Sequence, residues 1–127
     1  LVLLRRCGIQ VALITARNSK VAEARGRDLG VPVFIGAKDK LAQVQLLCEQ
    51  MDIQLHQVAF MGDDLPDLVA LRAVGLAVAP ANAHHWIAER VHWQTTAKGG
   101  KGAARELCDL LLDAQGYTDA LLAEQSA

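Results

Sequence analysis

Along the chain, short continuous apolar runs alternate with segments in which apolar residues recur every three or four positions. The first pattern is typical of strands that are buried on both faces, and the second is typical of helices with one apolar face. Strands are therefore predicted at residues 10–14, 33–35, 57–61 and 75–79, with a further short strand at 91–93. Helices are predicted at residues 18–29, 39–51, 65–73, 84–89 and 103–115, and the tail at 117–127 has helical character.

This alternation of strands and helices predicts an α/β fold with a three-layer, mostly parallel, Rossmann-like sheet. The sequence contains no internal repeat and no convincing linker, so residues 1–127 are predicted to form one domain. Folds of this class bind their ligands at the carboxyl ends of the strands. The polar residues that follow the predicted strands are therefore the candidates for function.

The composition supports a globular protein and narrows the class of partner. Hydrophobic residues make up 52% of the 127 residues and charged residues 21%, which is enough apolar material for a packed core. A net charge of −1 gives no electrostatic case for binding a nucleic acid or a membrane surface. No apolar run in the sequence approaches the length of a membrane-spanning helix.

The cysteines point to a reducing compartment. Cys7, Cys48 and Cys108 are odd in number and widely separated, and no two of them have the spacing of a metal-binding pair. Each lies among apolar residues in a segment with helical character. We therefore expect buried, reduced thiols in a cytoplasmic protein.

Two of the predicted strand ends carry weak signals for anion binding. Thr15 follows the first strand, where its hydroxyl and the backbone N–H groups of the next helix would suit a phosphate oxygen, although a simple helix cap is the alternative. Lys38 and Lys40 follow the second strand near a helix start, where cations oppose the helix dipole. Either lysine could neutralise a phosphate or a carboxylate, although solvated surface lysines are the more common case.

The third strand end carries the strongest signal. Gly62 is followed by Asp63, Asp64 and Asp67 within one turn, directly after a buried strand. Because like charges raise the cost of ionisation, stability alone does not favour such a cluster, and a hard divalent cation such as Mg²⁺ would relieve it. An acidic first helical turn is the alternative explanation, since the helix dipole favours it by about 0.3–1 kcal/mol per charge.

Two other motifs indicate less about function. The glycine-rich segment Lys98–Gly102 could form an anion-binding loop, but it matches neither the P-loop nor the dinucleotide-binding pattern. A flexible connector is the alternative. His84 and His85 lack the spacing of paired helical metal ligands and are expected at the start of a surface helix.

Taken together, the candidate residues resemble motifs of the haloacid dehalogenase superfamily. LITAR (Leu13–Arg17), Lys40 and GDDLPD (Gly62–Asp67) are similar to its second, third and fourth motifs, in the same order. A closer resemblance, over essentially the whole chain, is to the 3-deoxy-D-manno-octulosonate 8-phosphate phosphatases. The segments that carry it are LGVPVFIGAKDKL (29–41), VGLAVAPANAH (74–84) and KGGKGAARELCDLLLDAQG (98–116).

The resemblance implies a Mg²⁺-dependent phosphoric monoester hydrolase with a fold of the haloacid dehalogenase type. By the motif match, Thr15 binds the phosphoryl group, Arg17 contacts the substrate or structures the loop, and Lys40 stabilises the charge of the nucleophile and the phosphate. The substrate implied is the sugar-acid phosphate of lipopolysaccharide biosynthesis. Sialate-type 9-phosphate phosphatases, and phosphatase-like domains fused to sialate cytidylyltransferases, share much of the pattern and are the alternative.

The acidic turn takes the metal-binding role in the resemblance. Asp63 is expected to ligate Mg²⁺, while Asp64 and Asp67 complete the acidic site through water or through hydrogen bonds behind the metal. In the family, an aspartate of the first motif forms an aspartyl-phosphate, and a second aspartate two residues later acts as acid and base.

The first motif, an Asp-x-Asp-Gly run, does not occur in this chain, and no Asp-x-Asp is present anywhere in it. We expect it to precede Leu1 in a longer protein, on a strand central to the sheet. Family members are typically homotetramers, which sets the same expectation here. A non-catalytic oligomerisation domain is the alternative, whereas a response-regulator receiver fits poorly because its paired acids after the first strand are missing.

Overall fold

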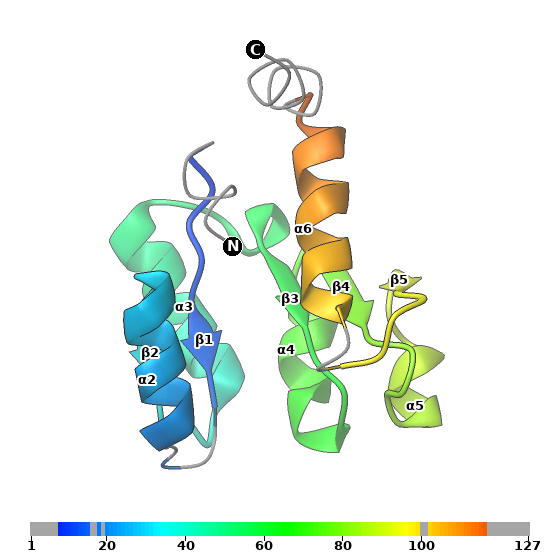
Figure 1. The fold of residues 1–127 in the computed structure, drawn as a ribbon, viewed down its shortest axis with the longest axis horizontal. Coiled ribbons are helices and arrows are strands. Elements are labelled where there is room, and N and C mark those ends of the chain that lie inside the picture. Colours follow the sequence, from blue (N-terminus) through cyan, green and yellow to red (C-terminus); the bar gives the residue numbers. More distant parts are fainter. Residues whose placement is uncertain (1–7, 16–17, 19, 100–101, 117–127) are drawn as a thin grey trace.

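The structure is a computed structural model that describes residues 8–15, 18, 20–99 and 102–116. Its strands and helices alternate along the chain (Figure 1). In chain order they are β1 (Leu13–Ile14), α2 (Lys20–Leu29), β2 (Val33–Phe34), α3 (Lys40–Met51), the 3-10 helix η1 (Leu55–Gln57), β3 (Ala59–Met61), the 3-10 helix η2 (Leu65–Asp67), α4 (Leu68–Ala73), β4 (Leu76–Ala79), α5 (His85–Ala88), β5 (Trp93–Gln94) and α6 (Ala103–Ala114). Each predicted strand and internal helix is therefore present. The predicted tail helix at 117–127 lies outside the described residues.

The strands are shorter than the apolar runs that predicted them, and they form two sheets instead of one. β1 pairs with β2, and β3, β4 and β5 pair in that order, all in parallel. Within the described part of the chain, β1 is hydrogen-bonded only to β2, and β3 only to β4. No hydrogen bonds between strands join β1 to β3 there, so the sheet is interrupted between these two strands. An additional central strand, as the sequence leads us to expect, would find unpaired edges of β1 and β3 on its two sides.

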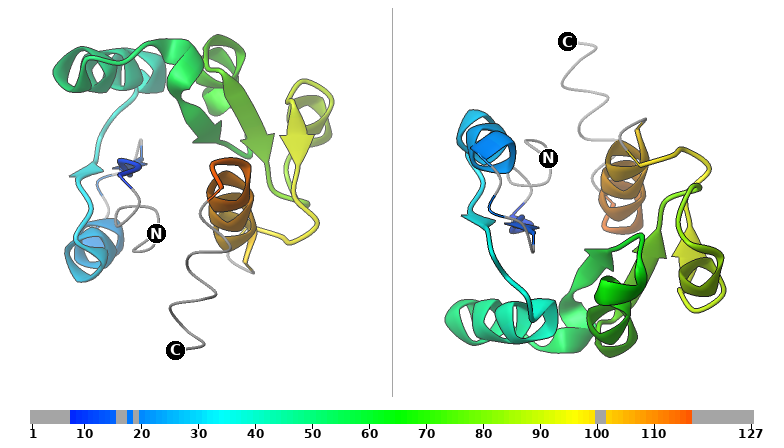
Figure 2. Two further views of the ribbon diagram at one scale, coloured as in Figure 1. Left: turned by 90° about the horizontal axis from the view of Figure 1, so that it is seen from above. Right: turned by 90° about the horizontal axis from the view of Figure 1, so that it is seen from below.

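Helices cover the strands on both sides, which confirms the predicted three-layer α/β arrangement (Figure 2). α3 and α4 lie on one side of the strands and α2 and α6 on the other, while α5 lies next to β5. The larger core fills the α3 and α4 side. Its buried residues are Val44, Cys48, Leu71, Val74, Ala77, Ala79 and Ile87.

A second, smaller cluster lies under α6. Its buried residues are Cys108 and Leu112, and Ile9 and Val11 from the segment before β1 pack against them. α6 therefore contacts the segment that leads into the two-stranded sheet, although the helix itself follows the three-stranded one. Cys48 and Cys108 are buried and free, as predicted, whereas Cys7 lies outside the described residues.

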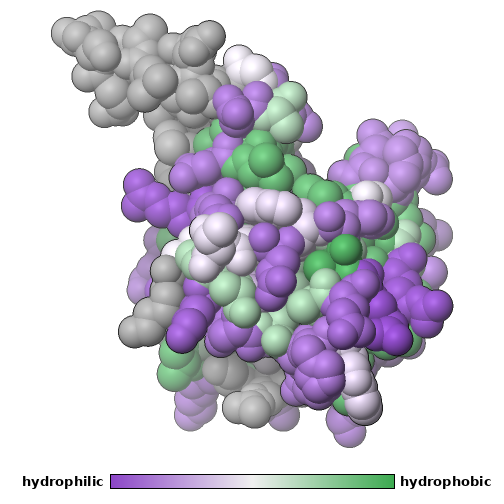
Figure 3. Space-filling model, turned by 90° about the vertical axis from the view of Figure 1, so that its right-hand side faces the viewer, coloured by the Kyte–Doolittle hydropathy of each residue, from purple (hydrophilic) through white to green (hydrophobic). Residues whose placement is uncertain are grey.

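One face of the molecule is drawn by hydropathy in Figure 3. On that face, hydrophilic residues separate the apolar ones into small groups (Figure 3). Within the described ranges, no helix combines the length and the apolar character needed to span a bilayer.

Candidate active site

The predicted site residues follow the carboxyl ends of strands in both sheets. The phosphate-binding candidates follow β1 and β2, and the metal-binding candidate follows β3. Thr15 comes directly after β1, where its N–H donates to the carbonyl of Phe34 (2.9 Å) and its carbonyl accepts from the N–H of Ala37 (2.9 Å). These bonds tie the end of β1 to the loop after β2. Arg17 lies outside the described residues, so its predicted role stays a prediction.

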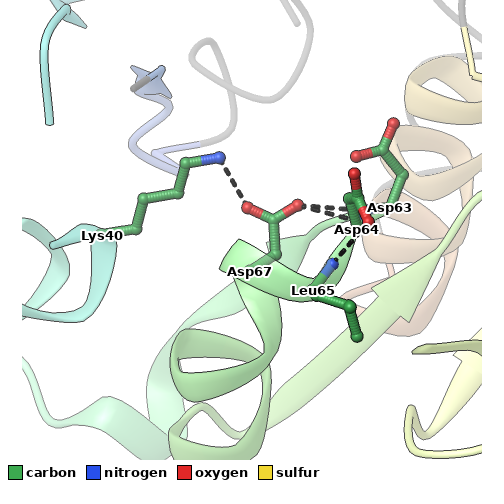
Figure 4. A network of polar contacts seen from close by, with 5 residues as sticks. All are labelled: Lys40, Asp63, Asp64, Leu65 and Asp67. Atoms are coloured by element: carbon green, nitrogen blue, oxygen red, sulfur yellow. Dashed lines mark hydrogen bonds and ion pairs between the residues drawn. The ribbon is translucent and has the colours of Figure 1, made fainter. Parts of the chain in front are cut away.

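Lys40 reaches the acidic turn from the start of α3. The side chain of Asp39 caps that helix by accepting a hydrogen bond from the N–H of Ala42 (3.0 Å), so Lys40 becomes its first residue. Its Nζ lies 2.5 Å from Oδ1 of Asp67 (Figure 4). The side chains of Lys40 and Asp67 are only 18% and 6% exposed. Lys38 is exposed, so the structure distinguishes the two lysines that the sequence left open.

Asp67 also organises the backbone of the acidic turn. Its Oδ2 accepts hydrogen bonds from the N–H groups of Asp63 (3.0 Å) and Asp64 (3.4 Å). Asp67 is thus a buried carboxylate. One of its oxygens pairs with the Lys40 ammonium, and the other accepts hydrogen bonds from two backbone N–H groups. A buried charge is tolerable only when it is paired and hydrogen-bonded in this way.

Gly62 makes this arrangement possible. A Cβ placed on Gly62 would lie 2.5 Å from the Cβ of Asp67 and 2.9 Å from its Oδ2. No side chain can occupy that space while Asp67 folds back over the turn. The glycine at the end of the apolar strand is therefore required by the close approach of Asp67.

Asp63 and Asp64 are exposed and have different surroundings. Oδ1 of Asp64 accepts a hydrogen bond from the N–H of Leu65 (2.7 Å) and caps η2. Within the described part of the chain, the Asp63 carboxylate makes no hydrogen bond or ion pair, and it points away from Asp67 (Figure 4). Its carbonyl is held by the N–H of His84 (2.9 Å). Asp63 is thus a fixed backbone position with a carboxylate available to a ligand.

This donor set fits magnesium better than a structural metal such as zinc. Among the described residues, no three His, Cys, Asp or Glu side chains come together in a group that could hold a metal ion. Mg²⁺ does not need such a group, because it typically keeps several waters and binds one or two carboxylates together with substrate phosphate oxygens. The single available carboxylate of Asp63 fits that mode.

The structure also shows residues at this edge that sequence reasoning missed. Glu106 of α6 accepts hydrogen bonds from the N–H groups of Thr96 (3.0 Å) and Ala97 (3.0 Å) and from the Thr96 hydroxyl (2.9 Å). These bonds, with the N–H of Thr96 contributing most, hold the pKa of Glu106 below its ordinary value of 4.5. No local spacing signals this contact, because its partners lie nine and ten residues apart in the sequence.

The histidines have structural contacts. Nδ1 of His84 accepts a hydrogen bond from the N–H of Trp86 (3.1 Å), so His84 caps α5 at the surface as expected. Nδ1 of His92 accepts a hydrogen bond from the N–H of Ala77 (2.8 Å), a contact that the sequence did not indicate.

The arrangement of Lys40 and the acidic turn also agrees with a known family. The family model described as haloacid dehalogenase-like hydrolase matches residues 31–107, which include Lys40 and the whole segment 62–67. The chain belongs to the haloacid dehalogenase-like hydrolases. Within these hydrolases it falls in the 3-deoxy-D-manno-octulosonate 8-phosphate phosphatase family.

Three relatives illustrate the match. The 3-deoxy-D-manno-octulosonate 8-phosphate phosphatase of Yersinia pestis is 44% identical over 108 residues, which cover 84% of this chain and 58% of the relative. A protein of Xanthomonas campestris described as hypothetical has a solved structure with 61% identity and a TM-score of 0.96, covering 99% of this chain and 69% of its own. The phosphatase of Moraxella catarrhalis, solved with magnesium, phosphate and KDO, has 37% identity and a TM-score of 0.93, covering 97% and 71%. The chain spans about 60% of the length of the curated relatives.

Proposed function

We propose that the protein is a Mg²⁺-dependent phosphatase that hydrolyses 3-deoxy-D-manno-octulosonate 8-phosphate to the free sugar acid and phosphate. The observation that carries the proposal is the Asp63 carboxylate, which no described residue binds and which lies at the carboxyl edge beside the largely shielded Lys40–Asp67 pair. The reaction class comes from the relatives of this family. The proposal extends to a cytoplasmic homotetramer that acts in lipopolysaccharide biosynthesis.

Each residue at the edge has a proposed task. Asp63 would hold the magnesium ion, which when bound neutralises phosphate charge as the phosphoryl group moves. Lys40 would add positive charge beside the reacting group, with Asp67 fixing the position of its ammonium. Thr15 would donate its hydroxyl to a phosphate oxygen, and Arg17 would contact the substrate. Asp64 would hold water at the metal or steady the turn.

The nucleophile in this proposal comes from an Asp-x-Asp-Gly segment that the chain does not contain. Asp67 cannot serve, because both of its oxygens are bound to Lys40 and to the turn. Asp63 is assigned to the metal. Among the described residues, β1 and β3 each have an edge with no strand partner, and these edges offer a place for the strand that would carry the nucleophile, between Thr15 and the acidic turn.

A non-catalytic oligomerisation domain is the competing proposal, and the lack of an Asp-x-Asp run favours it. The experiment is to supply the native protein with Mg²⁺ and measure phosphate release from 3-deoxy-D-manno-octulosonate 8-phosphate, a sialate-type 9-phosphate and a simple aryl phosphate. We expect the highest kcat/KM for the first substrate. Higher kcat/KM for the 9-phosphate would move the substrate assignment to the sialate type, and no release from any of the three would support the non-catalytic role.

A further inference from the structure

The segment Thr95–Gly99, which follows β5, is fixed at the same carboxyl edge as the acidic turn. Thr95 is 3% exposed, its N–H donates to the carbonyl of Ala79 (2.9 Å), and its hydroxyl donates to the carbonyl of Ala97 (2.6 Å). The carbonyl of Ala97 also accepts a hydrogen bond from the N–H of Ala81 (3.0 Å). The segment is therefore bonded to the end of β4 and to the loop that follows it.

A chain of contacts links this segment to the proposed metal ligand. The N–H of Gly99 donates to Oδ1 of Asn82 (2.7 Å). Asn82 lies two residues before His84, whose N–H donates to the carbonyl of Asp63 (2.9 Å). Because β5 is two strands away from β3, and neighbouring strands lie about 4.8 Å apart, the segment lies about 10 Å from the acidic turn along the sheet.

Glu106 holds this segment from the other side. Its carboxylate accepts the N–H groups of Thr96 and Ala97 at 3.0 Å, and charge-assisted bonds of this kind are stronger than neutral ones. The carbonyl of Lys98, the next residue, accepts a hydrogen bond from the N–H of Ala103 at the start of α6 (3.3 Å). The helix that carries Glu106 therefore determines where the exposed Lys98 and Gly99 lie.

The chemistry of the proposed substrate gives this placement a purpose. In 3-deoxy-D-manno-octulosonate 8-phosphate, the phosphate and the carboxylate lie at opposite ends of an eight-carbon chain. If the phosphate binds at Asp63 and Lys40, the acid end must reach another part of the edge. Lys98 provides an exposed cation two strands away, on a segment that Glu106 and Asn82 have already ordered.

We propose that Glu106 is a positioning residue that fixes the Thr95–Gly99 segment against Asn82, and that this ordered segment binds the carboxylate end of the sugar-acid substrate. The inference rests on the proposed function and adds a part of the edge that recognises the sugar acid separately from the phosphoryl group. Loss of the positioning should weaken binding of sugar acids and leave phosphoryl transfer from small esters unchanged.

The test compares two substrates in the native protein carrying Glu106→Gln. An amide of the same shape keeps the packing but replaces one acceptor oxygen with a donor that faces the backbone N–H groups. We expect kcat/KM for 3-deoxy-D-manno-octulosonate 8-phosphate to fall about tenfold, mostly through KM, while hydrolysis of an aryl phosphate stays within about twofold. The matched control is Glu89→Gln, since the Glu89 side chain is 65% exposed and its ion pair with Arg90 is 3.7 Å long. An equal loss for both substrates, or no loss for either, would overturn the inference.

A second measurement does not depend on activity. Hydrogen exchange should show faster exchange of the Gly99 amide in Glu106→Gln than in the unmodified protein, with unchanged protection in β4. Unchanged exchange at Gly99 would show that Glu106 does not position the segment. If the unmodified protein fails to hydrolyse the sugar-acid phosphate, the proposed function is wrong and the inference is overturned with it. That failure is visible before any variant is compared.

Discussion

The Nζ of Lys40 lies 2.5 Å from Oδ1 of Asp67, although the two residues follow strands of different sheets. β2 leads into Lys40, and β3 leads into the turn that contains Asp67. The ion pair therefore links the carboxyl edges of the two sheets across the interruption between β1 and β3. Because both side chains are largely shielded from water, removing one partner should cost more stability than removing one partner of an exposed surface pair.

Replacing Lys40 by Ala should affect catalysis and stability together. In the native protein we expect kcat to fall about 100-fold, because an electrostatic donor is lost from the reacting site. The free energy of unfolding should also fall by about 1–3 kcal/mol, less than for a fully buried pair, because Asp67 keeps its backbone donors. Steady-state kinetics and denaturant unfolding measure the two effects.

Lys38→Ala is the matched control for this variant, because Lys38 is exposed one residue before the cap of the same helix. We expect its kcat and its unfolding midpoint to stay close to those of the unmodified protein. Similar losses in the two lysine variants would show that Lys40 has been chosen wrongly.

Gly62→Ala should destabilise the acidic turn through steric overlap. The added Cβ would lie 2.5 Å from the Cβ of Asp67, so the backbone or Asp67 must move, at a cost of about 2 kcal/mol or more. Gly99→Ala is the control for stability, because the nearest atom to its added Cβ, Oδ1 of Asn82, is 3.4 Å away. Equal unfolding midpoints for the two variants would contradict the steric role of Gly62.

Glu106 should make stability depend on acid pH. Hydrogen bonds from Thr96 and Ala97 lower its pKa in the folded state below the unfolded value of about 4.5. The stabilisation is therefore complete above the unfolded pKa and is lost as the pH falls through the lower folded pKa. The difference in Tm between the unmodified protein and Glu106→Gln should shrink between about pH 6 and pH 3. A difference that stays constant over this range would show that the carboxylate contributes nothing through its charge.

Leu1–Ala127 expressed alone should release no phosphate from the sugar-acid phosphate with Mg²⁺. The chain contains no Asp-x-Asp, and an attacking oxygen must be held about 3–3.5 Å from phosphorus. The edges of β1 and β3 that have no partner in the described part of the chain should also make this segment prone to aggregate. The control is the native protein. Turnover by the segment within about tenfold of that control would contradict the assignment of the nucleophile.

The order of the elements could be predicted from the sequence, because apolar periodicity reports which faces are buried. In the predicted strand at residues 10–14, the four residues after Gln10 are apolar, yet only Leu13 and Ile14 pair as a strand. An apolar residue can be buried without pairing to a neighbouring strand. Val11, for example, packs against the buried residues of α6. Apolar runs therefore predict the position of a strand better than its length.

The acidic turn could be predicted as a site, but its internal contacts could not. Asp67 and Lys40 lie 27 residues apart, and their pairing depends on how two strands are placed in space. The bond from Glu106 to Thr96 depends in the same way on the packing of α6. Local sequence patterns carry no information on such distances, so these side chains could be assigned only from the structure.

The most direct test of the proposed metal site is the magnesium dependence of phosphate release in Asp63→Asn. In this variant of the native protein a weakly donating amide replaces the available carboxylate, while the hydrogen bonds that use the Asp63 backbone remain. Asp28→Asn, at an exposed position of α2, is the control. We predict that Asp63→Asn folds normally and loses Mg²⁺-dependent hydrolysis of 3-deoxy-D-manno-octulosonate 8-phosphate. Near-normal turnover with an unchanged dependence on magnesium concentration would contradict the assignment of this edge as the catalytic site.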